Sequence, residues 1–167
     1  MTVVHGFAPL SAPGARLLVL GSMPGKASLA VQQYYAHPRN AFWPIMGAIF
    51  GFDPQLPYAE RVAQLLSHQV AVWDVARLCT RTSSLDSDIV SASVVANDFA
   101  GFFTQHTQID RVLLNGAKAA ELYRRHVQRP LPEAATRDAV RLPSTSPAHA
   151  GMRFETKLLH WQNALLA

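Results

Sequence analysis

The chain has 167 residues, of which 49% are hydrophobic and 16% are charged. This composition excludes a disordered chain and predicts one packed domain over residues 1–167. The single cysteine, Cys79, excludes a disulfide framework and a four-cysteine metal site within one chain, so we expect a reducing, cytoplasmic setting. The formal net charge of +4 permits attraction to a polyanion without establishing it.

Neither a secretory signal nor a membrane span is expected. The N-terminus lacks a basic segment followed by an apolar core. The longest apolar run, Ala41 to Phe52, is too short to cross a bilayer and contains Pro44. We therefore expect a cytoplasmic protein with no membrane partner.

The N-terminal half alternates apolar segments with helical spacing. Arg16–Leu20 (RLLVL) is typical of a buried parallel strand and is followed by the loop GSMPG. Asn40 stands where an N-cap belongs, ahead of AFWPIMGAIF, and Gly51 is a stop signal. Pro57–Leu66 predicts a second helix. Val70–Trp73 predicts the next strand, followed by Asp74 and Val75.

The C-terminal half continues the pattern. Asn97 is positioned to cap a helix over DFAGFFTQH, and Arg111–Leu114 predicts a third strand. Gly116 precedes the helical stretch AKAAELYRRH. Ala139–Leu142 predicts the last strand, followed by PSTSP, and a final helix is expected over Arg153–Leu166.

Strands and helices in this order predict an α/β fold, a three-layer α/β/α sandwich around a mainly parallel four-stranded sheet. Ligands of open parallel sheets bind beyond the carboxyl ends of the strands. The loops GSMPG, DV, NG and PSTSP follow the four strands and should converge there.

Three familiar kinds of site do not fit. GSMPGKAS is not a phosphate-binding P-loop, because only three residues separate its glycines and Lys26 is followed by Ala27. The nucleophile elbow of serine hydrolases is absent, so Ser144, Ser146 and His149 are interpreted as a polar loop. The histidines are scattered without ligand spacing, and no metal is expected.

The stretch YYAHPRNAFW, from Tyr34 to Trp43, is dense in aromatic and polar residues. Aromatic rings beside a cationic loop suit base stacking next to phosphate contacts. Phe42 and Trp43 are better explained as core residues of the following helix. Tyr34 and Tyr35, in the loop, are the candidates for stacking.

The order GSMPG, HPRNAFW, VWDV, LNG and PSTSPA resembles the uracil-DNA glycosylase superfamily, and within it the hypoxanthine-DNA (deoxyinosine) glycosylase branch. The resemblance runs from about Leu17 to Trp161. It implies a monofunctional DNA N-glycosylase, acting as a monomer at the nucleoid on DNA with deaminated bases, preferably hypoxanthine, with no cofactor. Two alternatives stay open: a uracil or G·T/G·U mismatch glycosylase, and a catalytically inactive DNA-binding protein.

The resemblance also implies roles for individual residues. Met23 stands where better-known branches carry the Asp or Asn that aims the attacking water, and the deoxyinosine branch places that role on Asn40. A helix cap is the alternative role for Asn40. Tyr35 takes the place of the aromatic that stacks on the extruded base. Asp74 falls in the base-reading segment and can accept the N1–H of hypoxanthine, or cap the next turn.

The remaining predicted contacts surround the base and the DNA backbone. Ser22 and Met23 join the base-binding loop, and Ser144 stands where the superfamily has His or Asn. Ala148 is too small to fill the gap left by a flipped nucleotide, which leaves Met152, His149 and Arg153 as candidates. The residues expected to contact DNA are Arg39, Ser144, Thr145, Ser146, His149 and Arg153.

Overall fold

The computed structural model describes residues 2–167, and its centre is a four-stranded parallel sheet in the order β3-β2-β6-β7. All four predicted strands are present, each within one residue of the expected bounds, which confirms the α/β fold. The strands are β2 (Leu17–Gly21), β3 (Val70–Asp74), β6 (Arg111–Asn115) and β7 (Asp138–Leu142).

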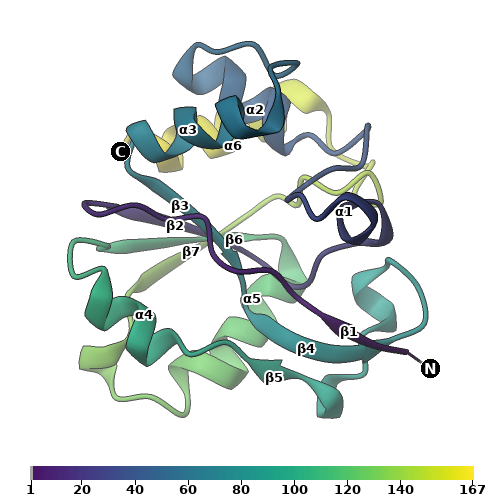
Figure 1. Cartoon of the computed structure of the whole chain (residues 1–167), viewed down its shortest axis with the longest axis vertical. Helices are drawn as coiled ribbons and strands as arrows, with labels where there is room; N and C mark the ends of the chain where they lie inside the picture. Colours follow the sequence, from purple (N-terminus) through teal and green to yellow (C-terminus); the bar gives the residue numbers. More distant parts are fainter. Residues whose placement is uncertain (1) are drawn as a thin grey trace.

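Helices cover both faces of this sheet, and Figure 1 shows the three layers. One layer consists of α2 (Phe42–Phe50), α3 (Tyr58–Ser67) and α6 (Phe154–Leu165), and the other of α4 (Phe99–Gln105) and α5 (Ala117–Tyr123). The short α1 (Lys26–Val31), which the sequence pattern did not predict, lies at one end of the sheet.

Strand β2 is apolar and buried throughout because each of its two faces packs against helices, whereas β7 at the sheet edge exposes four of its five residues. In β2, Leu18 and Leu20 belong to the core on the α4–α5 side, whereas Leu17 and Val19 belong to the core on the α2–α3–α6 side. Side chains alternate in this way along every strand of the sheet. The parity of a position therefore decides which layer its side chain meets.

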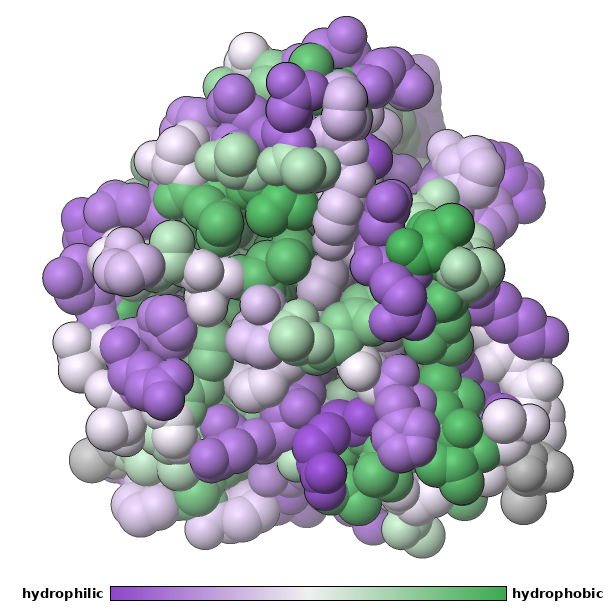
Figure 2. Space-filling view, viewed as in Figure 1, coloured by the Kyte–Doolittle hydropathy of each residue, from purple (hydrophilic) through white to green (hydrophobic). Residues whose placement is uncertain are grey.

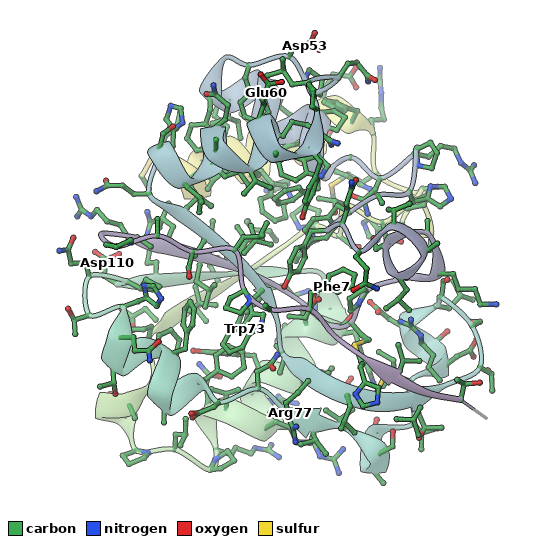
Figure 3. All side chains as sticks on the ribbon, viewed as in Figure 1. Phe7, Asp53, Glu60, Trp73, Arg77 and Asp110 are labelled. Carbon is green, nitrogen blue, oxygen red and sulfur yellow. The ribbon has the colours of Figure 1, made fainter. Side chains whose placement is uncertain are left out.

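A second, antiparallel sheet was not predicted. It consists of β1 (Thr2–His5), β4 (Ala76–Arg81) and β5 (Val95–Ala96), in the order β1-β4-β5. The chain after β1 runs along the outer edge of β3, where Leu10 and Val72 exchange backbone hydrogen bonds of 2.8 and 2.9 Å. Trp73 donates its indole N–H to the Phe7 carbonyl at 3.1 Å, and Figure 3 labels both side chains.

Two predicted helix caps differ from the structure. Asn97 does not cap α4, because Asp98 is the cap and accepts the Gly101 N–H at 3.0 Å, while Asn97 donates to the Asp74 carbonyl at 2.8 Å. Helix α2 begins one residue later than expected. Asn40 nevertheless accepts the Phe42 N–H at 2.9 Å, so it serves the helix start.

Polar and apolar residues both occur on the outside of the helical layers, where α6 exposes Phe154 and Leu159. Figure 2 shows hydrophilic surface over the top of the molecule, where α3 exposes Glu60 (labelled in Figure 3). Arg61 of the same helix is only partly exposed, and its guanidinium lies 4.8 Å from the centre of the Trp43 ring. No helix within residues 2–167 has the length and apolarity needed to cross a membrane.

Trp161 of α6 offers a test of how this layer supports the loop after β7. Its ring is fully buried, and its N–H donates to the Pro143 carbonyl at 3.0 Å. Trp161→Phe removes the donor and should lower the free energy of unfolding by about 1–3 kcal/mol, measured by urea denaturation. Leu159→Ala on the same helix, at an exposed position, should change it by less than about 0.5 kcal/mol. Equal effects of the two substitutions would contradict this role of Trp161.

Candidate active site

A cavity of about 820 Å³ opens at the carboxyl ends of the parallel strands. The predicted convergence of the four loops is confirmed, because each contributes to its lining. From the first loop and α1 come residues 21–28, and from the last loop residues 144–149. The remaining lining consists of Tyr34, Tyr35, His37, Arg39, Asn40, Asp74, Ser84, Leu85, Asp86, Ser87, Asn115, Ala117, Lys118 and Glu121.

The strand register places three of these positions in one row. Gly21 of β2 pairs with Asp74 of β3, and the register of β2 with β6 carries Gly21 next to Asn115. All three positions point to the same face of the sheet as Val19. The side chains of Asp74 and Asn115 therefore face the α2 layer, where Tyr35 packs. A Cβ at Gly21 would overlap Asp74 Oδ1 and lie 3.1 Å from Tyr35 Oη. Glycine therefore leaves room beside the strand for the Asp74 carboxylate and the Tyr35 phenol.

The Asp74 carboxyl is buried, at 4% exposure, and Oδ2 has no hydrogen-bond partner among residues 2–167. Burial raises its pKa to about 7, and the negative charge of Asp86 adds to the increase, while Arg81 opposes it. No backbone N–H among those residues donates to the Asp74 carboxyl. The structure therefore does not support the alternative role of Asp74 as a turn cap. An unpaired buried acceptor on a cavity wall is suited to binding a ligand N–H.

Tyr35 is held in an unusual conformation beside Asp74. Its φ of 56° lies in the left-handed region, which is uncommon for residues other than glycine and occurs often at functional sites. One face of its ring stacks on Phe42, with centroids 4.2 Å apart and planes inclined by 24°. Burial, and then the charge of Asp74, raises the pKa of Tyr35, so the phenol is neutral. Phe42 thus fixes the plane of the ring against the cavity.

Asn40 combines the two roles that the sequence left open. Its carboxamide oxygen must be the atom bound to the Phe42 N–H, because that backbone group is a donor. The amide NH₂ then remains, and no acceptor for it occurs within the described part of the chain. Since Asn40 also lines the cavity, its oxygen supports α2 while its nitrogen is available to a ligand.

Sequence reasoning missed Asn115, which joins two of the loops. Its amide donates to Thr145 Oγ1 and its oxygen accepts the Thr145 N–H, both at 2.9 Å. The next residue, Gly116, has φ of +95°, and a Cβ there would lie 2.9 Å from Ser144 Cβ. The motif NG was noticed only as a loop, although an amide directly after a buried strand was a usable signal.

The first loop is tied to a segment that no motif indicated, the residues after β4. Ser22 donates its hydroxyl to Asp86 at 2.5 Å, and the Lys26 N–H donates to Ser84 Oγ at 2.8 Å. Burial raises the pKa of Asp86, opposed by the bond from Ser22. Met23 lines the cavity but is buried in the core, so the thioether is a wall and not a ligand.

The last loop is preorganised by its own serines. Ser144 Oγ accepts the Ser146 N–H at 3.1 Å, and Ser146 Oγ accepts the Ala148 N–H at 3.2 Å. Both hydroxyl hydrogens stay available as donors. Of the other predicted DNA contacts, Arg39, Thr145 and His149 line the cavity, whereas Arg153 lies outside the lining at the start of α6. Residues 2–167 contain no cluster of three or more His, Cys, Asp or Glu side chains arranged to hold a metal ion.

The buried carboxyl makes stability depend on pH. Asp74 titrates near pH 7 when folded and at about 3.9 when unfolded, so its penalty grows from about pH 4 to pH 7 and is complete above. Asp74→Asn should raise Tm by at least about 2 °C at pH 8, and by less than half as much at pH 5. Asp110→Asn, at an exposed site, is the control. A gain independent of pH would contradict the raised pKa.

Comparison with known proteins identifies the family of this chain. Residues 8–166 match the family model of the uracil DNA glycosylase superfamily. Hypoxanthine DNA glycosylases of Methanosarcina barkeri and Methanosarcina acetivorans are 34% and 32% identical, over 70% and 71% of this chain and 73% and 75% of theirs. A solution NMR structure from Methanosarcina acetivorans, provisionally described as a uracil DNA glycosylase, superposes with a TM-score of 0.81 at 28% identity, covering 98% of this chain and 97% of that one. The chain belongs to the uracil DNA glycosylase superfamily.

Proposed function

We propose that the protein is a monofunctional DNA N-glycosylase that excises deaminated bases, preferably hypoxanthine, from cellular DNA. The observation that carries this is the unpaired Asp74 carboxyl beside Tyr35 in a cavity of about 820 Å³, a volume within the usual range for small-molecule sites. The names of the two similar curated proteins support the choice of base. Action as a monomer is part of this proposal.

The extruded base enters with its ring against Tyr35. Phe42 occupies one face of Tyr35, so the base stacks on the other, and the aromatic pair supports it from behind. Stacking of a base on an aromatic side chain contributes about 1–3 kcal/mol, comparable to the cost of flipping the nucleotide. Asp74 Oδ2, when ionised, accepts the N1–H of hypoxanthine, and it accepts the N3–H of uracil equally well.

Cleavage of the glycosidic bond leaves negative charge on the departing base and positive charge on the sugar. The available donors on the cavity wall are the Asn40 amide, the Ser144 hydroxyl and the backbone N–H groups of Met23 and Gly25, which have no acceptor among residues 2–167. Donors fixed in place before the reaction stabilise such charge without reorganisation. Asn40 acts closest to the chemistry, by holding the departing base or the attacking water.

The rim of the cavity matches a DNA backbone. Lys26 and Arg39 are exposed, line the cavity, and have no carboxylate within 4 Å in the described residues. The hydroxyls of Ser144 and Ser146 supply neutral donors beside them. Phosphate contacts of this kind position the duplex without reading its sequence.

A panel of oligonucleotides tests the reaction. Duplexes with one inosine, uracil, xanthine or G·T mispair are incubated with the protein and treated with alkali, which cleaves at abasic sites. We expect the fastest cleavage at inosine. Faster cleavage at uracil would show that uracil, and not hypoxanthine, is the preferred base. Absence of abasic product from every duplex would contradict the proposed glycosylase function.

Substitutions at Asn40 separate capping from catalysis. Asn40→Asp and Asn40→Ser keep an oxygen for the Phe42 N–H but remove the amide donor. Single-turnover excision of inosine should fall by roughly 10²–10³ in both, the usual loss for one such donor, while Tm stays near that of the wild type. Asn40→Ala, which also loses the cap, should unfold more easily by about 1 kcal/mol. A full excision rate in the Asp or Ser variant would show that Asn40 only caps the helix.

A further inference from the structure

Leu85 combines two properties that no other described residue shares. Nine large hydrophobic side chains in residues 2–167 are exposed, and of these only Leu85, at 48% exposure, lines the cavity. Its neighbours on the lining, Ser84, Asp86 and Ser87, are polar. An isolated exposed leucine is ordinary on a protein surface. An exposed leucine in the lining of a binding cavity, in contrast, is positioned to contact a substrate.

The segment around Leu85 is anchored on both sides. Ser84 accepts the Lys26 N–H and Asp86 accepts the Ser22 hydroxyl, which fixes the segment to the first loop. Within the segment the Leu85 N–H donates to Ser83 Oγ at 2.9 Å, and its carbonyl accepts the Asp88 N–H at 3.1 Å. In Figure 1 this segment, between β4 and β5, lies at the same end of the molecule as α1. These hydrogen bonds therefore fix the turn that carries the exposed Leu85 side chain.

The side chains expected from the sequence to enter the DNA stack are less suitable. Met152 and Arg153 do not line the cavity. His149 does, but it is polar, and Ala148 ends at Cβ. The last loop thus offers no large apolar group to the duplex, whereas the segment after β4 does.

We propose that Leu85 inserts between base pairs and fills the gap left when the target nucleotide enters the cavity. Apolar side chains such as leucine serve this purpose in proteins that unstack DNA, because they replace lost stacking with apolar contact. The carboxylates of Asp86 and Asp88 accept hydrogen bonds from the hydroxyls of Ser22 and Ser83. This inference rests on the proposed glycosylase function and adds the residue that keeps the base extruded.

The test compares one inosine-containing strand in duplex and single-stranded form under single-turnover conditions. Leu85→Ala should slow excision from the duplex by about tenfold or more, since unstacking costs a few kcal/mol, and excision from the single strand by less than about twofold. Leu85→Met, which keeps apolar bulk, should restore at least half of the duplex rate. Leu159→Ala, a matched exposed leucine on α6, should match the wild type on both substrates.

Two results would overturn the inference while leaving the glycosylase intact. One is a duplex rate of Leu85→Ala within twofold of an active wild type, and the other is an equal loss on both substrates. Failure of Leu85→Met to restore the duplex rate would also overturn it, because apolar bulk would then not be the property that matters. A wild type that excises inosine from neither substrate overturns the proposed function and this inference with it.

Discussion

The packing of the Asp74 carboxyl and the Tyr35 phenol against Gly21 is the constraint on which the site depends. Three parallel strands end in register, and the middle one ends in glycine, so a carboxylate from one side and a phenol from a loop fill the space where a side chain would stand. A residue with a Cβ at that position would push both groups apart. The cost is a buried carboxyl without a partner, whose pKa rises to about 7. Such a cost is usual where function and not stability selects the residue.

The rest of the fold holds this packing in place from several directions. Phe42, at the start of α2, supports the Tyr35 ring, and Asn40 secures that helix start while keeping its amide free. Asn115 joins the end of β6 to the last loop through two hydrogen bonds to Thr145. These hydrogen bonds and the ring contact hold donor groups in place without a ligand, and donors fixed in advance stabilise developing charge without reorganisation.

The sequence was sufficient for the parts of the molecule that depend on local pattern. Strands such as Leu17–Gly21, apolar on both faces, were recognisable, and motif order led to Tyr35 and Asn40. The antiparallel sheet was not, because Ala76–Arg81 mixes polar and apolar residues and pairs with the distant N-terminus. Asp86 was missed for a similar reason, since its bond to Ser22 spans 64 residues. At the start of α4, Asn97 and Asp98 are both suited to capping, and only their tertiary contacts decide which of them caps the helix.

The most direct test is a crystal structure of the Asn40→Ser protein bound to a duplex containing inosine. The account predicts hypoxanthine inside the cavity, stacked on the face of Tyr35 opposite Phe42, with N1 at about 3 Å from an Asp74 carboxylate oxygen. An inosine still paired within the helix, or a flipped base that contacts neither Tyr35 nor Asp74, would contradict it.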